Sequence, residues 1–215
     1  MFRKRLCFSK KGNLRFIGHL DLLRVFGETI ARSRLPVCYS AGFNPHILLS
    51  FALPLPLGFV SENDYADLVF NEDLPYGEIM AGLNNAAPKG LIIKDAYNAL
   101  DKCASVVALA DYSIPVSFVT SYEFHEADVF VKIEETLSKN EIIIPKKTKS
   151  GIKNTDIRQD IFFVKAIKGE VHMRLSAGSE RFLHPIVACE AMFGFGPSPV
   201  GFTRLEMYKP GPVKL

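Results

Sequence analysis

The apolar residues of this chain change their spacing in the same order twice, and this pattern restricts the possible fold more than any single motif. Residues 3–8 resemble a strand, and Leu22, Leu23, Phe26 and Ile30 then recur at helical spacing. The segments "PVCYS", "HILLSFAL" and "DYADLVF" are strand-like, "PYGEIMAGLNNAAP" is helix-like, and "GLIIKDAYNAL" is again strand-like. The first half therefore predicts the order βαββαβ.

The second half has a similar order of patterns. A strand-like "YSIPVSF" precedes a helical stripe in "EADVFVKIEETLSKN", and "EIIIPKK", "IFFVKAI" and "VHMRLSA" are strand-like. The segment "FLHPIVACEAMFG" indicates a helix with proline in its first turn, and "GFTRLEMYKP" indicates a last strand. We therefore expect an α+β fold of two tandem ferredoxin-like (βαββαβ) halves with antiparallel sheets, residues 1–105 and 106–215.

Charge is distributed unevenly although the net charge is only +3. The first 35 residues carry nine Lys or Arg and two acids, whereas residues 61–80 carry six acids and no base. The asymmetry favours either a polyanion-binding face or a protein-docking face. We expect the acids of residues 61–80 to form a solvated face. With no signal segment and no apolar stretch of spanning length, the expected location is the cytoplasm, without a membrane partner.

Cysteine spacing argues against a metal or redox centre. The four cysteines stand at positions 7, 38, 103 and 189, so the chain has neither a CxxC pair nor a zinc-ribbon pattern. The sequence also lacks the GxSxG motif of a hydrolase nucleophile and the GxxxxGK[ST] motif of a nucleotide triphosphate site. We expect no cofactor, free thiols, and a protein that is more readily a binding module than an enzyme.

A shaped loop lies at "YSAGFNPHI". Gly42 tolerates a positive φ and Asn44 precedes a proline, so the segment is stiff and turned. Such a loop would present Tyr39, Ser40, Asn44 and His46 as ligand-binding candidates. The alternative is that the loop only sets the angle at which the chain enters the next strand.

A second group of candidates lies at the start of the first predicted helix, in "LRFIGHLDLLR". Arg15, His19, Asp21 and Arg24 would gather at a helix N-terminus, which is a natural place for phosphate. A metal site would need His46 as a third ligand beside His19 and Asp21. A purely structural role of His19 is the third possibility. The hypothesis that unites both groups is one positively biased hollow where the loop and the helix start meet.

A third group lies in the polar segment "KKTKSGIKNTDIR", which we expect to be a mobile loop. Lys146, Lys147, Lys149 and Arg158 suit contacts with a phosphate backbone. A solvated lysine loop without a ligand is the alternative. The later segment "RLSAGSERFLHP" offers backbone amides before a helix expected to begin near Phe182, although Ser179 and Glu180 also make an ordinary helix cap.

Several of these segments resemble one known family. "FSKKGNLRFIGHLD", "YSAGFNPH", "SFALPLPLG" and "SENDYAD" are similar to the radical-SAM-linked family, a bacterial domain of unknown function encoded beside, or fused to, an uncharacterised radical SAM protein. The resemblance is specific over residues 3–70 and weaker through "IKNTDIR" and "MRLSAGSERFLHP". Ile47 stands where the family pattern has a proline.

The resemblance implies a partner and assigns no catalytic residue. A radical SAM enzyme needs three clustered cysteines for its iron–sulfur cluster, which this chain lacks, so the radical enzyme would be a separately encoded protein. We expect a non-catalytic accessory or substrate-recognition module that binds RNA, either tRNA or rRNA, for its modification. The alternatives are a protein-docking module without nucleic-acid binding and a small metal-dependent RNA-processing enzyme.

Overall fold

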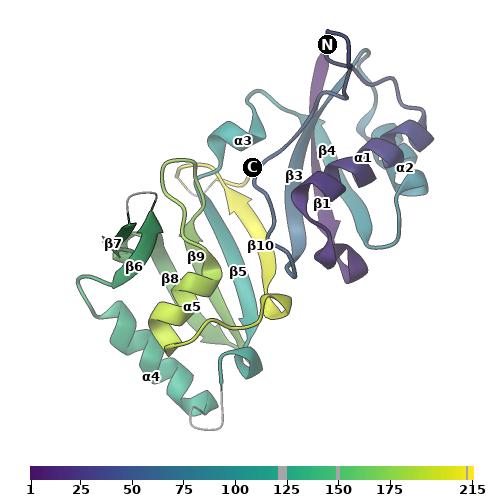
Figure 1. Ribbon diagram of the computed structural model, residues 1–215. Helices are drawn as coiled ribbons and strands as arrows, with labels where there is room; N and C mark the ends of the chain where they lie inside the picture. Colours follow the sequence, from purple (N-terminus) through teal and green to yellow (C-terminus); the bar gives the residue numbers. More distant parts are fainter. Residues whose placement is uncertain (121–124, 149–150, 212) are drawn as a thin grey trace.

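One long sheet runs through the whole molecule in the computed structural model (Figure 1), which describes residues 1–120, 125–148, 151–211 and 213–215. Its strands follow the order β4-β1-β3-β10-β5-β9-β8, and β2 pairs with β3. The first half contains β1 Phe2–Lys10, η1 Gly12–Phe16, α1 His19–Ser33, β2 Leu49–Phe51, β3 Val60–Phe70, α2 Tyr76–Ala86 and β4 Leu91–Asn98.

The second half begins with the short helix α3 and adds a separate two-stranded sheet, β6-β7. Its elements are α3 Cys103–Val106, β5 Leu109–Pro115, η2 Val116–Phe118, α4 Glu126–Leu137, β6 Ile143–Thr148, β7 Gly151–Asp156, η3 Arg158–Asp160, β8 Ile161–Ile167, β9 Glu170–Ser176, α5 Pro185–Phe193, η4 Pro199–Gly201 and β10 Thr203–Tyr208.

Each half packs two helices against one face of its strands. In the first half, β1 is antiparallel to both β3 and β4, and α1 lies beside α2. Leu22, Phe26 and Ile30 are buried, as the helical spacing predicts, and the Phe26 ring meets Phe8 of β1 edge to face. In the second half, α4 lies beside α5, and β5 pairs with β9 and β10. An α+β fold with a largely antiparallel sheet is therefore confirmed.

The two halves share a sheet because β10 pairs with β3. This contact is parallel and short, joining Thr203 to Val60 and Arg204 to Ser61. A hydrophobic cluster continues across it, with Phe59 stacked on Phe202 at a centroid distance of 4.7 Å. The expected boundary between residues 105 and 106 falls inside α3.

Two local expectations were wrong. The strand-like segments on either side of the "YSAGFNP" loop form mostly isolated bridges, Val37 to Phe70 and Tyr39 to Ile47, and β2 is only three residues long. Prolines at 36, 45 and 54 remove the amides that a longer ladder would need. The lysine segment is a β-hairpin and not a loop.

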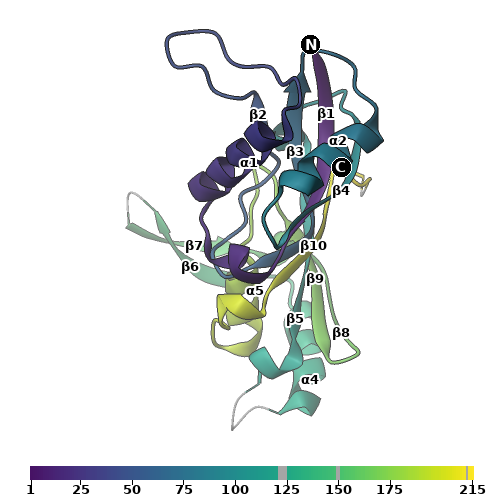
Figure 2. The same ribbon diagram turned by 90° about the vertical axis from the view of Figure 1, so that its right-hand side faces the viewer.

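Two segments extend away from the sheet. Figure 2 shows the β6–β7 hairpin extending to the left at mid-height and the loop before β2 extending at the top of the molecule. Within the described residues, no helix combines the length and apolar character needed to cross a membrane.

Candidate functional site

Arg15 is a structural clamp between chain segments. Its guanidinium donates to the Gly58 carbonyl at 2.7 Å and also to the Val200 carbonyl, which belongs to the second half. Gly58 has a φ of +87°, and an added Cβ there would lie 2.8 Å from Pro199, so the loop approaches η4 closely. Arg15 therefore holds the "LPLPLG" loop against η4, and both of its donor contacts go to backbone carbonyls.

The other candidates at the start of α1 are only partly engaged. Asp21 lies in the first helical turn and pairs with Arg24 at 2.8 Å on the exposed surface. The His19 ring contacts Phe51 of β2 edge to face, at a centroid distance of 5.5 Å. This contact explains why His19 is half-buried, and it is consistent with the structural alternative.

The loop before β2 closes on itself. Ser40 Oγ lies 2.8 Å from His46 Nδ1 and accepts from the His46 amide at 3.1 Å, while the Ser40 amide donates to the His46 carbonyl. Tyr39 and Asn44 are exposed on this loop. The loop is therefore an ordered hairpin that presents its side chains to solvent.

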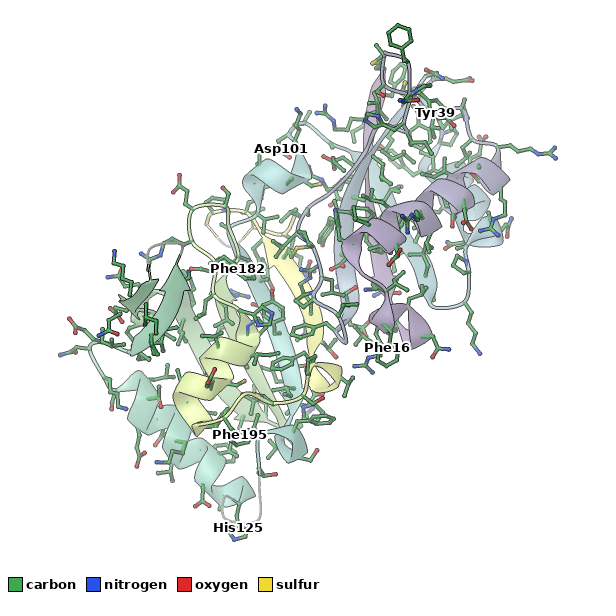
Figure 3. The ribbon with its side chains drawn as sticks, viewed as in Figure 1. Phe16, Tyr39, Asp101, His125, Phe182 and Phe195 are labelled. Atoms are coloured by element: carbon green, nitrogen blue, oxygen red, sulfur yellow. The ribbon has the colours of Figure 1, made fainter. Side chains whose placement is uncertain are left out.

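The structure does not bring the two groups into one hollow. Phe51 touches His19, whereas His46 stands five residues earlier, roughly 16 Å away at about 3.3 Å per extended residue. Figure 3 shows Phe16, near the start of α1, and Tyr39, in the loop, at opposite ends of the first half. His19, Asp21 and His46 also do not meet as a metal triad, and the described residues contain no group of three potential metal ligands.

The lysine candidates lie on the β6–β7 hairpin. Lys146 is exposed and stands opposite Lys153 in the ladder. Lys147 lies on β6, although its side chain is outside the described part, and Lys149 lies outside the described residues. The hairpin therefore carries at least two neighbouring exposed ammonium groups on a projecting arm.

Arg158, the remaining candidate, is engaged within the chain. Its guanidinium donates to the carbonyls of Leu137, Lys139 and Ile161 at 3.1 to 3.3 Å. Leu137 is the last residue of α4, so Arg158 satisfies a carbonyl at the negative end of that helix. This position leaves the hairpin lysines, and not Arg158, as the available cations of the segment.

A hollow lies beneath the hairpin. A cavity of about 490 Å³ is enclosed by β6, β7, η3 and α5. Apolar side chains form most of its wall, and Lys146, Asp160, His184 and Glu190 also line it. Sequence reasoning included only Lys146 of these four, because the others converge only after α5 packs beside η3.

His184 has a defined role at this wall. Its Nδ1 accepts from the Ile186 amide at 3.3 Å as the N-cap of α5. Burial lowers the pKa of His184 below its ordinary value of 6.5, so the ring is neutral near pH 7. Because Nδ1 accepts, the proton of the neutral ring sits on Nε2. The helix begins at Pro185 and not near Phe182, which leaves Phe182 on the preceding segment.

A second hollow adjoins the first. It measures about 310 Å³, and Phe182 lines both hollows. Its opposite wall is Ala52, Leu53 and Pro54, from the first half. Arg204 fixes that wall by donating to the carbonyls of Leu53 and Pro54. Two segments that carry the resemblance, "SFALPLPLG" and "RLSAGSERFLHP", therefore meet at this hollow, and Phe182, labelled in Figure 3, belongs to the second of them.

The acidic stretch is only partly a solvated face, and that expectation was wrong for two of its acids. Asp64 pairs with Arg204 at 2.7 Å, and Asp67 pairs with Arg5 at 2.8 Å. All four side chains are at least 96% buried. The arginine partners, Arg204 and Arg5, explain the error, because both are remote in sequence and neither is visible from the acidic segment alone.

A family model for uncharacterized proteins conserved in bacteria (DUF2344) matches residues 3–185. The chain belongs to this family. The match spans every predicted site residue and also Phe182, whereas Val187, Glu190 and Ala191 of the cavity wall lie beyond it. Membership confirms the broader part of the resemblance, a bacterial family of unknown function. No curated protein matches the chain in sequence.

The four cysteines of this DUF2344 protein are free and buried. Burial raises the pKa of Cys7 to about 11 and of Cys103 to about 12, so neither thiol is a ready nucleophile. Cys38 and Cys189 are also buried. The hairpin lysines stand next to a cavity whose wall also carries the polar side chains of Thr155, Asp160, His184 and Glu190.

Proposed function

We propose that this protein is a non-catalytic accessory that binds RNA, tRNA or rRNA, and presents it to a separately encoded radical SAM enzyme in the cytoplasm. The observation that carries the proposal is the juxtaposition of exposed Lys146 and Lys153 on a projecting hairpin with a 490 Å³ cavity directly beneath it. Ammonium groups on such an arm neutralise backbone phosphates, and the cavity is of ligand size.

The architecture supports this proposal. The strand orders β4-β1-β3-β2 and β10-β5-β9-β8 are the same permutation, with paired helices on one face, and we infer that each half is a ferredoxin-like unit. Tandem units of this kind occur in RNA-binding proteins, which is a likeness of fold alone. The radical SAM partner is implied by the family resemblance, and four dispersed cysteines cannot form a radical SAM cluster, so the proposal assigns the radical chemistry to a separate protein.

A second candidate is a protein-docking module without nucleic-acid binding. Four exposed apolar side chains surround the Arg15 clamp: Phe16, Leu20, Leu57 and Val200, each between 38% and 69% exposed. An exposed apolar group of this kind is typical of a protein contact. The two functions are compatible if the patch receives the radical enzyme while the hairpin holds RNA.

The direct test is an anisotropy titration with labelled tRNA over a range of salt concentrations. We expect tight binding at low salt and a linear fall of log K with log salt. Charge reversal in Lys146→Glu/Lys153→Glu should weaken binding by about tenfold or more and reduce the salt slope by about 1 to 2. The matched control is Lys165→Glu/Lys168→Glu, which changes charge equally on β8 and its turn, and should bind like the wild type.

Absence of tRNA and rRNA binding at low salt would overturn the proposal in favour of docking. In that case Leu57→Glu should abolish co-purification with a radical SAM partner, because it places a charge in the apolar group around Arg15. If Leu57→Glu still co-purified with the partner, the hypothesis that this apolar surface docks a protein would be excluded as well.

A further inference from the structure

We propose that the cavity beneath the hairpin seats one unpaired base of the bound RNA, stacked on the ring of Phe182 where the two hollows meet. The inference rests on the proposed RNA binding and adds to it a site, a stacking residue and a preference for unpaired nucleotides. Its structural basis is the position of Phe182, which borders both the 490 Å³ and the 310 Å³ hollows.

The cavity has the shape and lining of a site for a flat ring. Apolar walls come from Ile144 of β6, Val187 of α5 and two connecting residues, Ile157 before η3 and Leu183 before α5. Its volume lies within the range of about 300 to 1,000 Å³ that is usual for small ligands. A nucleobase has apolar faces and a polar edge, so it can meet such walls with its faces while its edge reaches the polar groups.

Phe182 is a suitable stacking platform. Its side chain is 43% exposed, although the residue is held at the backbone level by a bridge to Ala177. The ring lies 6.3 Å from the His184 ring in an edge-to-face arrangement, which places it beside a polar group of the cavity wall. An exposed aromatic ring on a fixed backbone is the arrangement that proteins use to stack single-stranded bases.

The polar groups of the wall offer both kinds of hydrogen bond. His184 Nε2 carries a proton, since Nδ1 accepts from Ile186, and Nε2 has no hydrogen-bond partner in the described part of the chain. Glu190 contributes a carboxylate, whereas the Asp160 carboxylate is already held by Arg181 at 2.8 Å. One donor and one acceptor match the mixed edge of a base, and Lys146 stands at the rim for the adjoining phosphate.

A paired base cannot use this site. A duplex keeps its bases stacked inside the helix, and entry into a protein cavity requires that the base leave that stack. The lysines of the hairpin, in contrast, can contact the backbone of either form. The expected ligand is therefore a single-stranded or looped segment of RNA.

The test uses a single-stranded RNA 10-mer that contains one 2-aminopurine, whose fluorescence changes on stacking. We expect the wild type to change this fluorescence and Phe182→Ala to abolish the change while weakening binding by about 5- to 100-fold. Phe162→Ala removes another exposed phenylalanine, from β8, and should behave like the wild type. Phe182→Tyr should retain the signal because it retains a ring.

A cavity-filling variant gives an independent test in case Phe182→Ala loses the signal because it misfolds. Ala191→Phe adds a ring from α5 into open space, and it should block the fluorescence change while thermal unfolding stays close to that of the wild type. The inference is overturned if tRNA binds but neither Phe182→Ala nor Ala191→Phe alters the 2-aminopurine signal. That result would leave the proposed RNA binding intact, whereas absence of any RNA binding would remove both.

Discussion

Some charged residues of this protein are buried and others are exposed, and the sequence alone does not show which are which. Asp64 and Asp67 are buried in ion pairs, whereas Glu62 remains partly exposed and pairs with Lys11 and Lys94. All three acids stand within six positions on one strand. Which acids are buried depends on Arg5 and Arg204, whose positions beside β3 follow from strand pairing and cannot be derived from local composition.

At this same scale, His184 predicts a pH dependence of stability. Burial holds its pKa below 6.5, so as pH falls through 6.5 the unfolded chain binds a proton that the folded chain does not. His184 thus supports the fold fully above pH 6.5 and less as pH falls, by at most about 1.4 kcal/mol per pH unit. His184→Asn retains a capping acceptor and removes the titration.

Urea unfolding at pH 7.5, 6.5 and 5.5 checks this prediction. The free energy of unfolding of the wild type should fall more steeply with acidification than that of His184→Asn. Parallel pH curves for the two proteins would show that the imidazole titrates equally in the folded and unfolded states.

Among the elements, those with strong periodicity were predictable and those with weak periodicity were not. The stripe Leu22, Phe26, Ile30 identified α1, and Pro185 stands at the first turn of α5 as the sequence indicated. The β6–β7 hairpin was missed because its second strand, "GIKNTD", has almost no apolar alternation. The cavity beneath it could therefore not be foreseen, since one of its walls was expected to be a mobile loop.

Arg158 connects two secondary-structure elements, because it joins η3 to the end of α4. Arg158→Ala leaves the Leu137 carbonyl without this donor, and we expect a loss of about 1–2 kcal/mol in the free energy of unfolding. Arg158→Lys should recover only part of this free energy, because one ammonium group cannot replace a guanidinium that donates to three carbonyls. Chemical denaturation measures the free energy of unfolding of both variants, and the tRNA titration measures their RNA binding. If Arg158→Ala left stability unchanged and weakened RNA binding, Arg158 would be a phosphate contact and not a structural residue.

For the whole molecule, most of the order of helices and strands could be predicted from the sequence, but the junction between the halves could not. Repeated spacing predicted an α+β chain with antiparallel strands, which needs only local patterns. The parallel pairing of β3 with β10 joins residues about 140 positions apart, and Arg204 completes it by holding Asp64 and the Leu53 and Pro54 carbonyls. No local pattern encodes such a partner choice.

This junction predicts that the two halves unfold together. Burial raises the pKa of Asp64 and Arg204 opposes that shift, so Arg204→Met leaves a buried acid without its partner at a cost of about 3–5 kcal/mol. Because the pair joins β3 to β10, we expect a single calorimetric transition in the wild type and a broadened or divided one in Arg204→Met. The control is Arg174→Met, which breaks an ion pair with Asp111 inside the second half and should lower the midpoint of one undivided transition. Two transitions in the wild type would contradict the argument, because the halves would then be held side by side without sharing their stability.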